Sequence, residues 1–149
     1  WRDSGESGKA SQMALVIGRR FEENGLSQNS LDLYEQALAM YQVGDELEDC
    51  IESIGGIPQR VLAGMNHVDL QNLVKLQIES AMSLANLNQG AKSAVFYQDA
   101  FDIMQEAPAA HEVEDKTLMF PIFSGWFLAL RSRHIEDDEY GSYEQSVIA

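Results

Sequence analysis

The stretch ALVIGRRFEENGLSQNSLDLYEQA, residues 14–37, decides the fold of this chain. Its pattern predicts a helix, a short turn at Gly25 and a second helix, with small and aromatic residues recurring at helical spacing. Small side chains let two antiparallel helices approach closely, and aromatic rings fill the space that remains between them. The stretch therefore predicts a helical hairpin whose interlocking residues are Gly18, Phe21, Ser30, Tyr34 and Ala37.

A second stretch, SAMSLANLNQGAKSAVFYQDA at residues 80–100, follows the same plan. Ser93 to Ala100 repeats the spacing of Ser30 to Ala37, 63 residues further along the chain. Two such units predict a protein built from helical repeats. The positions of the second unit that compare with the first are Ala81, Leu84, Gly90, Ser93, Tyr97 and Ala100.

This pattern resembles the tetratricopeptide repeat, a helical hairpin of about 34 residues. That family places a glycine or alanine and then an aromatic residue in its first helix, and a small residue, an aromatic residue and an alanine in its second. Its characteristic positions are occupied here by Gly18, Phe21, Ser30, Tyr34 and Ala37. The sequence departs from the family at Ala14, where tryptophan is usual, and at Gln42, where proline is usual.

The resemblance implies an all-α fold in which antiparallel helical hairpins stack as a tetratricopeptide-like α-solenoid with a capping C-terminal helix. The 63-residue offset is a few residues short of two repeats, which predicts an irregular middle hairpin. Helix pairs with similar spacing also occur in bundles and in other helical solenoids, so both stay open as alternatives.

We expect a flexible lead-in at residues 1–10, a helical-repeat domain at 11–133 and an acidic mobile tail at 134–149. Caps, glycines and prolines predict the boundaries within the domain, including a loop at 109–111. The expected helices are 11–24, one from Ser27 or Asn29 through Tyr41, a short acidic one at 45–54, a short one from Pro58, one from Asp69 to near Gly90, 92–106, and 118–130 with a kink at Pro121.

Composition and charge limit the classes of partner. The 149 residues carry a net charge of −14, so their field repels nucleic-acid phosphates and anionic lipids, and we expect no direct nucleic-acid binding. The apolar run 118–130 is too short to span a membrane. The lone Cys50 cannot form an internal disulfide, which favours an intracellular setting, cytoplasmic or nuclear. The opening at Trp1, without an initiating methionine, favours a piece of a longer protein.

Two sequence patterns resemble binding sites, one for phosphate and one for a metal ion, and we interpret both as structural. Residues 3–11 are similar to the phosphate-binding loop of GTPases, but Asp3 replaces a glycine, Ala10 replaces a hydroxyl residue, and only Trp1 and Arg2 remain of the upstream strand that such a loop requires. His111 with Glu114 or Asp115 has the spacing of two metal ligands on a helix, yet a third and a fourth ligand are missing. Since no nucleophile, base and orienting group come together, we expect no enzyme, no cofactor and no metal.

In tetratricopeptide domains the first helices of successive hairpins line a concave groove, and the resemblance implies such a site here. Members that clamp the acidic tails of heat-shock chaperones carry lysine and asparagine where Leu15 and Arg19 stand, so that activity is not expected. Apolar residues flanked by glutamates suit an amphipathic helix or an extended peptide with basic residues. The implied groove residues are Gln12, Leu15, Val16, Arg19, Glu22, Glu23, Lys75, Ile78, Glu79, Met82 and Asn86.

The apolar last helix admits two roles. Its large residues are expected to cover the exposed end of the stack, namely Phe120, Phe123, Trp126, Phe127 and Leu130. Alternatively, Phe123, Trp126 and Phe127 form a second interface, since aromatic anchors contribute much of the energy of interfaces. We therefore expect a non-enzymatic scaffold for a protein or peptide partner. The alternative is a structural segment of a larger assembly, or of a helical-repeat region in a bigger enzyme.

Overall fold

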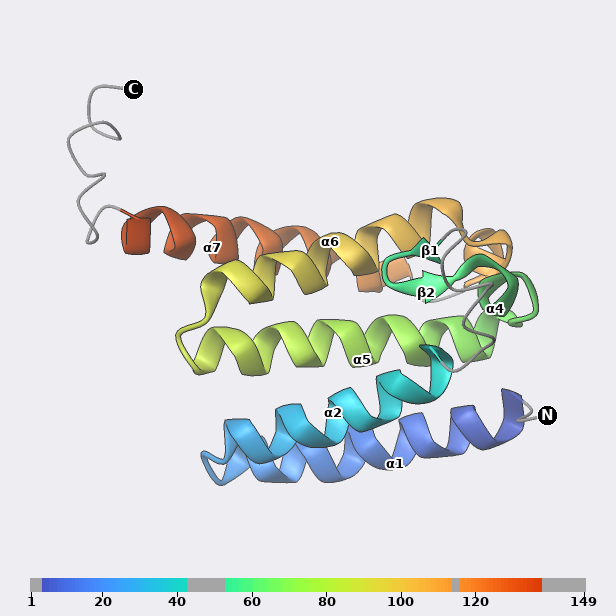
Figure 1. Cartoon of the computed structure of the whole chain (residues 1–149), viewed down its shortest axis with the longest axis horizontal. Helices are drawn as coiled ribbons and strands as arrows, with labels where there is room; N and C mark the ends of the chain where they lie inside the picture. The colour runs from blue at the N-terminus through green and yellow to red at the C-terminus, as the bar shows by residue number, and fades with distance from the viewer. Residues whose placement is uncertain (1–3, 43–52, 114–115, 138–149) are drawn as a thin grey trace.

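The computed structural model describes residues 4–42, 53–113 and 116–137 (Figure 1). Within these ranges most residues are helical, which confirms the expected helical class. The long helices are α1 (Ser4–Glu23), α2 (Ser27–Gln42), α5 (His67–Asn86), α6 (Gly90–Glu106) and α7 (Met119–Asp137). The shorter elements are β1 (Ser53–Ile54), β2 (Ile57–Pro58), α4 (Gln59–Ala63) and the 3-10 helices η1 (Pro108–Glu112) and η2 (Lys116–Leu118).

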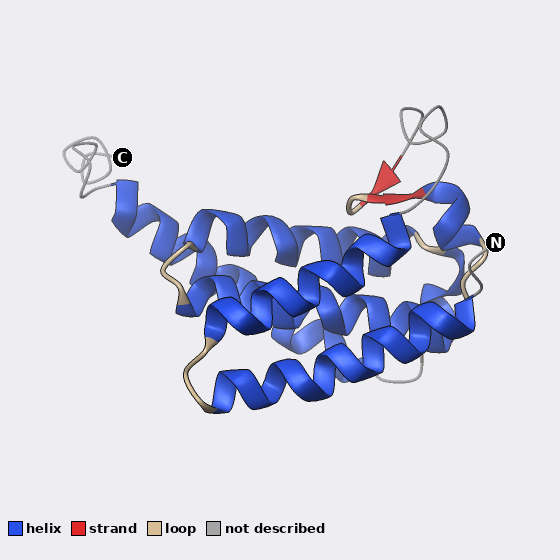
Figure 2. Cartoon of the chain, turned by 60° about the horizontal axis from the view of Figure 1, so that its bottom comes forward, coloured by secondary structure: helices blue, strands red, loops and turns tan. Residues whose placement is uncertain are grey.

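Helix α5 is the centre of the molecule. It packs against α1, α2 and α6, while α7 packs mainly on α6. Helices α1, α5 and α7 run in one direction and α2 and α6 in the other, and the connections within the two hairpins lie at the same end (Figures 1 and 2). Leu70, Leu73 and Leu76 of α5 are completely buried, so the core is built around this helix and receives side chains from both hairpins.

The α1–α2 hairpin interlocks as its sequence predicts. Gly25 supplies the turn with a φ of 75°, a backbone conformation that glycine adopts without strain. The Ser30 hydroxyl donates a hydrogen bond of 2.6 Å to the Gly18 carbonyl, and both residues are buried. The Tyr34 ring occupies the space where a side chain at Gly18 would be. The glycine therefore lets α1 and α2 come close enough to hold the tyrosine between them.

The α5–α6 hairpin repeats that hydrogen bond. The Ser93 hydroxyl donates to the Ala81 carbonyl over 2.7 Å, and each of these residues lies 63 positions after its counterpart in the first hairpin. Asn88 has a φ of 62° and provides the turn. Ala100 is completely buried and Tyr97 nearly so. The repeated spacing of Ser93 to Ala100 is therefore accompanied by a repeated serine hydrogen bond between two helices.

The N-terminal expectation is wrong for most of its length. Residues 1–3 lie outside the described part of the chain, but α1 begins at Ser4, so residues 4–10 are helical rather than a flexible lead-in. Gly8 is buried beside the Asp69 carboxylate, and the Ser11 hydroxyl is hydrogen-bonded to that of Tyr41. The early turns of α1 thus have α2 and α5 to pack against, which stabilises a helix that composition alone does not predict.

The middle of the chain differs from the expected acidic helix at 45–54. Residues 45–52 lie outside the described part, and the last two positions form β1, which pairs with β2 in antiparallel register. Gly55 and Gly56, which follow the helix expected at 45–54, have φ values of 61° and 82°, as a tight two-residue turn between strands requires. Helix α4 begins directly after Pro58, as predicted.

Helix α5 begins two residues earlier than expected. It starts at His67 rather than Asp69, because the side chain of Asn66 accepts a hydrogen bond of 2.9 Å from the Asp69 amide and caps the helix. The expected loop at 109–111 is also wrong, since these residues belong to the 3-10 helix η1.

The last helix is longer than predicted and has Pro121 in its first turn. A proline there removes no intrahelical hydrogen bond, since the first amides of a helix have no partner within it, so nothing forces the kink that we expected at Pro121. Because α7 continues to Asp137, the expected mobile tail is wrong at 134–137, and 138–149 lie outside the described residues. The expected aromatic cover is also wrong in part, because Ile122 and Ala129 are buried whereas Phe120 and Phe127 are exposed.

Candidate functional site

The residues implied for the groove all lie on α1 and α5, which contact each other. Leu15 and Ile78 are buried in the hydrophobic core and offer no surface to a partner. Glu22, Lys75 and Glu79 are half-buried. The exposed members of the set are Gln12, Val16, Arg19, Glu23, Met82 and Asn86.

Several of these residues contact one another in what we call the α1–α5 polar cluster, formed by Arg19, Glu22, Glu79, Ser83 and Asn86. Arg19 forms an ion pair of 3.1 Å with Glu79. The Glu22 carboxylate accepts hydrogen bonds from the Ser83 hydroxyl at 2.7 Å and the Asn86 amide at 2.9 Å. With two carboxylates and one guanidinium, the cluster both joins α1 to α5 and leaves negative charge on this face.

Tyr34 lies beneath this cluster. Its hydroxyl is buried and has no hydrogen-bond partner among the described residues. Burial raises the pKa of the phenol, and the nearby charges of Glu79 and Glu22 raise it further. The ring therefore stays neutral at physiological pH, and it serves as a packing element between α1 and α2 rather than as an acid or a base.

A largely apolar pocket of about 340 Å³ lies between α5, α6 and α7, and we call it the α5–α7 pocket. Burial, followed by the charge of Glu79, raises the pKa of Tyr97 in its wall to about 12, so this hydroxyl keeps its proton. Met82 and Leu128 are exposed at its edge, and Asn86 belongs both to the pocket and to the polar cluster. Its lining residues are Met82, Ala85, Asn86, Gly90, Tyr97, Pro121, Ser124, Gly125, Leu128 and Ala129.

A second hollow on this side follows α1. It measures about 410 Å³ and includes three of the implied groove residues, Val16, Arg19 and Glu23, together with Arg20 and Asn24. Of the implied set, five residues therefore line a hollow of the surface, with Met82 and Asn86 at the α5–α7 pocket. Gln12 and Lys75 line neither hollow.

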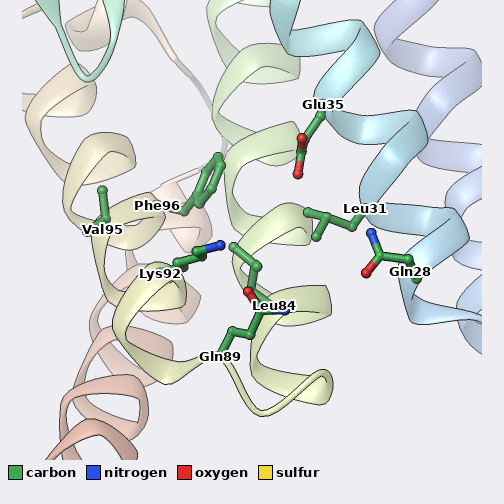
Figure 3. A pocket seen from close by; sticks show the side chains of 8 residues that line it. All are labelled: Gln28, Leu31, Glu35, Leu84, Gln89, Lys92, Val95 and Phe96. Atoms are coloured by element: carbon green, nitrogen blue, oxygen red, sulfur yellow. The ribbon is translucent and has the colours of Figure 1, made fainter.

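Sequence reasoning missed a third pocket, of about 330 Å³, between α2 and α6. In Figure 3, Gln28 and Glu35 extend from α2 while Lys92 and Phe96 extend from α6. Leu31 and Leu84 form apolar parts of its wall, and both are buried in the hydrophobic core. The exposed Val95, one turn after Lys92, was the available signal for an apolar patch on this side.

The aromatic residues of α7 divide between core and surface. Trp126 and Phe123 pack against Phe101 of α6, with ring centroids 5.7 Å and 5.5 Å apart. Trp126 is half-buried, whereas Phe127 is 65% exposed. Of the three residues expected at a second interface, Phe127 and Phe123 thus present surface, and Trp126 belongs mostly to the packing of α7 on α6.

Among the described residues, the two sequence patterns that suggested phosphate or metal binding belong to ordinary helical elements. Residues 4–11 of the loop-like segment are helical in α1, which gives them no phosphate-binding geometry. His111 lies 3.8 Å from Glu112, and Glu114 is outside the described residues. Among the residues that the structure describes, no three of the His, Cys, Asp and Glu side chains are grouped to hold a metal ion. In the same ranges no helix has the length and hydropathy to cross a bilayer.

Comparison of the chain with protein-family models, with curated proteins and with solved structures found no match. Its function must therefore follow from the geometry of its own residues. The strongest feature is the face made by α1 and α5 and extended by α7, where the α5–α7 pocket adjoins the negatively charged polar cluster.

Proposed function

We propose that this chain is a non-enzymatic protein-interaction scaffold. In this proposal the first helices of tetratricopeptide-like hairpins, α1 and α5, and the following α7 form a face that holds a helix or an extended peptide of a partner. The parallel direction of the three helices and the repeated serine hydrogen bond support the solenoid arrangement. The intracellular setting rests on the single cysteine of the sequence.

The observation that carries the proposal is the position of the α5–α7 pocket beside the polar cluster. Asn86 lines the pocket and also donates its hydrogen bond to Glu22, so an apolar cavity and excess negative charge are adjacent. Met82 and Leu128 at the edge are apolar, and methionine adapts its shape to different ligands. A large aliphatic side chain in the pocket, with lysine or arginine one or two turns away, has the complementary chemistry.

Selection from a random peptide library displayed on phage tests this proposal. We expect the enriched peptides to combine a large aliphatic residue with nearby basic residues. Their affinity, measured by fluorescence anisotropy, should fall at least about tenfold in the Met82→Glu variant, because the new carboxylate places a charge at the edge of the apolar pocket.

Val95→Glu is the matched control for this experiment. Val95 is 56% exposed and Met82 47%, but Val95 lines the pocket between α2 and α6. Affinity should therefore be unchanged in this variant. Equal losses in both variants, or a library from which no peptide is enriched, would contradict the proposed site.

A second candidate function, a structural segment of a larger assembly, is favoured by one observation. Phe120 and Phe127 of α7 are 76% and 65% exposed, which is unusual for phenylalanine on the surface of an isolated domain. This role requires packing against other subunits or further helices rather than capture of a peptide. It predicts that peptide selection fails while the chain self-associates.

A further inference from the structure

One side of α7 carries a continuous strip of large apolar side chains, which we call the α7 strip. It consists of Phe120, Phe123, Phe127 and Leu130, which are 76%, 51%, 65% and 45% exposed. The intervals along the helix are three, four and three residues, the spacing that places side chains on the seam between two paired helices. The strip is therefore arranged to pack against another helix.

The α7 strip is separate from the rest of the surface of α7. Ile122 and Ala129 point into the core, and Leu128 lines the α5–α7 pocket. No charged residue occurs between Met119 and Leu130, although the chain as a whole has a net charge of −14. The strip has no side chain that could form an ion pair with a charged partner. A neutral and apolar surface is complementary to it.

We infer that the α7 strip pairs with the same strip of a second copy of this chain. A two-fold axis brings an identical patch onto itself, so a self-complementary apolar seam with helical spacing meets the requirement of such an interface. From these exposed fractions, the strip side chains of two copies present together at most about 900 Å² of apolar area. This is just under the roughly 1,000 Å² of a stable specific interface, so the pair is a weak dimer, to which the exposed and uncharged Ser124 beside the strip adds contact.

The pairing is expected to respond to salt in a defined direction. Two copies with a charge of −14 each repel one another, and dissolved ions screen that repulsion. Because the strip itself has no charges, salt weakens no attraction across the interface. The fraction of dimer should therefore rise between about 0.05 M and 0.5 M salt.

Light scattering coupled to size-exclusion chromatography tests the inference on the full chain. At about 100 μM we expect twice the chain mass of 16.6 kDa. Phe127→Glu should return the mass to that of a monomer, and Phe120→Glu serves as a second variant if the first fails to fold. Circular dichroism must show unchanged helix content, because both side chains are mostly exposed.

Leu128→Glu is the matched control, since Leu128 is 60% exposed on the same helix but lies outside the strip. This variant should remain a dimer. A monomeric wild-type chain, a folded Phe127→Glu variant that is still dimeric, species larger than a dimer, or dissociation at high salt would each overturn the inference.

The inference and the proposed function fail separately. Leu128→Glu should weaken capture of a selected peptide without changing the mass, because Leu128 lines the α5–α7 pocket. Phe127→Glu should change the mass without changing that affinity. A result that breaks only one of these expectations therefore identifies which of the two surfaces was wrongly interpreted.

Discussion

The α1–α2 and α5–α6 hairpins share one hydrogen bond and differ in where their tyrosine packs. Ser30 bonds to the Gly18 carbonyl, and Ser93 bonds to the Ala81 carbonyl. In the first hairpin the Tyr34 ring packs onto Gly18 of the same hairpin. In the second hairpin the Tyr97 ring packs onto the glycine of a later helix, Gly125 of α7.

This difference shows which contacts are local to a hairpin and which depend on the next helix. The first hairpin supplies both the tyrosine and the glycine that accommodates it. The second hairpin has Ala81 where the first has Gly18. Its Tyr97 packs instead on Gly125, which lies 28 positions later in the sequence. Helix α7 is therefore part of the packing of the second hairpin, and its loss should affect that hairpin more than the first.

The largest effect is expected where a glycine accommodates a tyrosine within one hairpin. Gly18→Leu would place a side chain in the volume that the Tyr34 ring occupies. Since the core cannot expand to admit it, we expect a loss of about 3 kcal/mol or more in the free energy of unfolding, measured by urea denaturation.

Two further variants sharpen this prediction. Gly64→Ala should change stability by no more than about 0.5 kcal/mol, because an added Cβ would make only ordinary contacts there. Tyr34→Ala should recover part of the stability when combined with Gly18→Leu, although it is destabilising by itself. An additive double variant would show that the two side chains do not compete for one space.

A smaller and more localised effect is expected at the contact between the second hairpin and α7. Gly125→Ala would bring a methyl group into the Tyr97 ring, and we expect a net loss of about 2 kcal/mol after the gain in helix propensity. Amide hydrogen exchange should show protection falling in α7 and persisting in α1 and α2. Uniform loss of protection would mean that the two hairpins do not differ in their dependence on α7.

The hairpins could be predicted from the sequence because their decisive contacts are short-range. The serine, the tyrosine and the small residue that α2 packs on all lie within 17 residues of one another, and helical spacing fixes their faces. By contrast, the extension of α1 to Ser4 depends on Gly8 lying beside Asp69, a contact that no local pattern shows. The strands β1 and β2 were missed because Gly55 and Gly56 can end a helix as well as form a tight turn.

The sequence could predict which faces of the helices form the candidate site, but not which of its residues contact one another. The resemblance placed Arg19, Glu22 and Glu79 in one groove; in the structure Arg19 pairs with Glu79, whereas Glu22 bonds to Ser83 and Asn86 further along α5. Spacing along a helix could not show that Arg19 pairs with Glu79 rather than remaining available to a partner. The α5–α7 pocket depends on how α7 lies on α6, so Leu128 had no local signal to mark it.

The shared hydrogen bond allows a direct test of how equivalent the hairpins are. Ser30→Ala and Ser93→Ala each remove a buried hydroxyl that donates to a helix carbonyl. We expect each variant to lose about 1 kcal/mol in urea denaturation, with the two losses agreeing within about 0.5 kcal/mol. Ser124→Ala is the control, since its hydroxyl bonds to the Phe120 carbonyl on an exposed surface. Clearly unequal losses would show that the hairpins share the spacing of their residues but not the stabilisation by the serine hydrogen bond.

The smallest expected effect is a difference between the two hairpins in how their stability depends on pH. Asp99 of α6 is half-buried beside the turn at Gly55, and burial followed by the charge of Asp102 raises its pKa from 3.8 to about 6. Its counterpart 63 residues earlier is Gln36, which has no charge to lose. Because the folded chain holds this proton more tightly than the unfolded chain, the carboxylate should cost stability as pH rises through about 6. Asp99→Asn should therefore stabilise the chain at pH 7 by about 0.5 kcal/mol, allowing for solvent screening, with the gain vanishing below 3.8. A gain that is independent of pH in urea denaturation would exclude the carboxylate as its source.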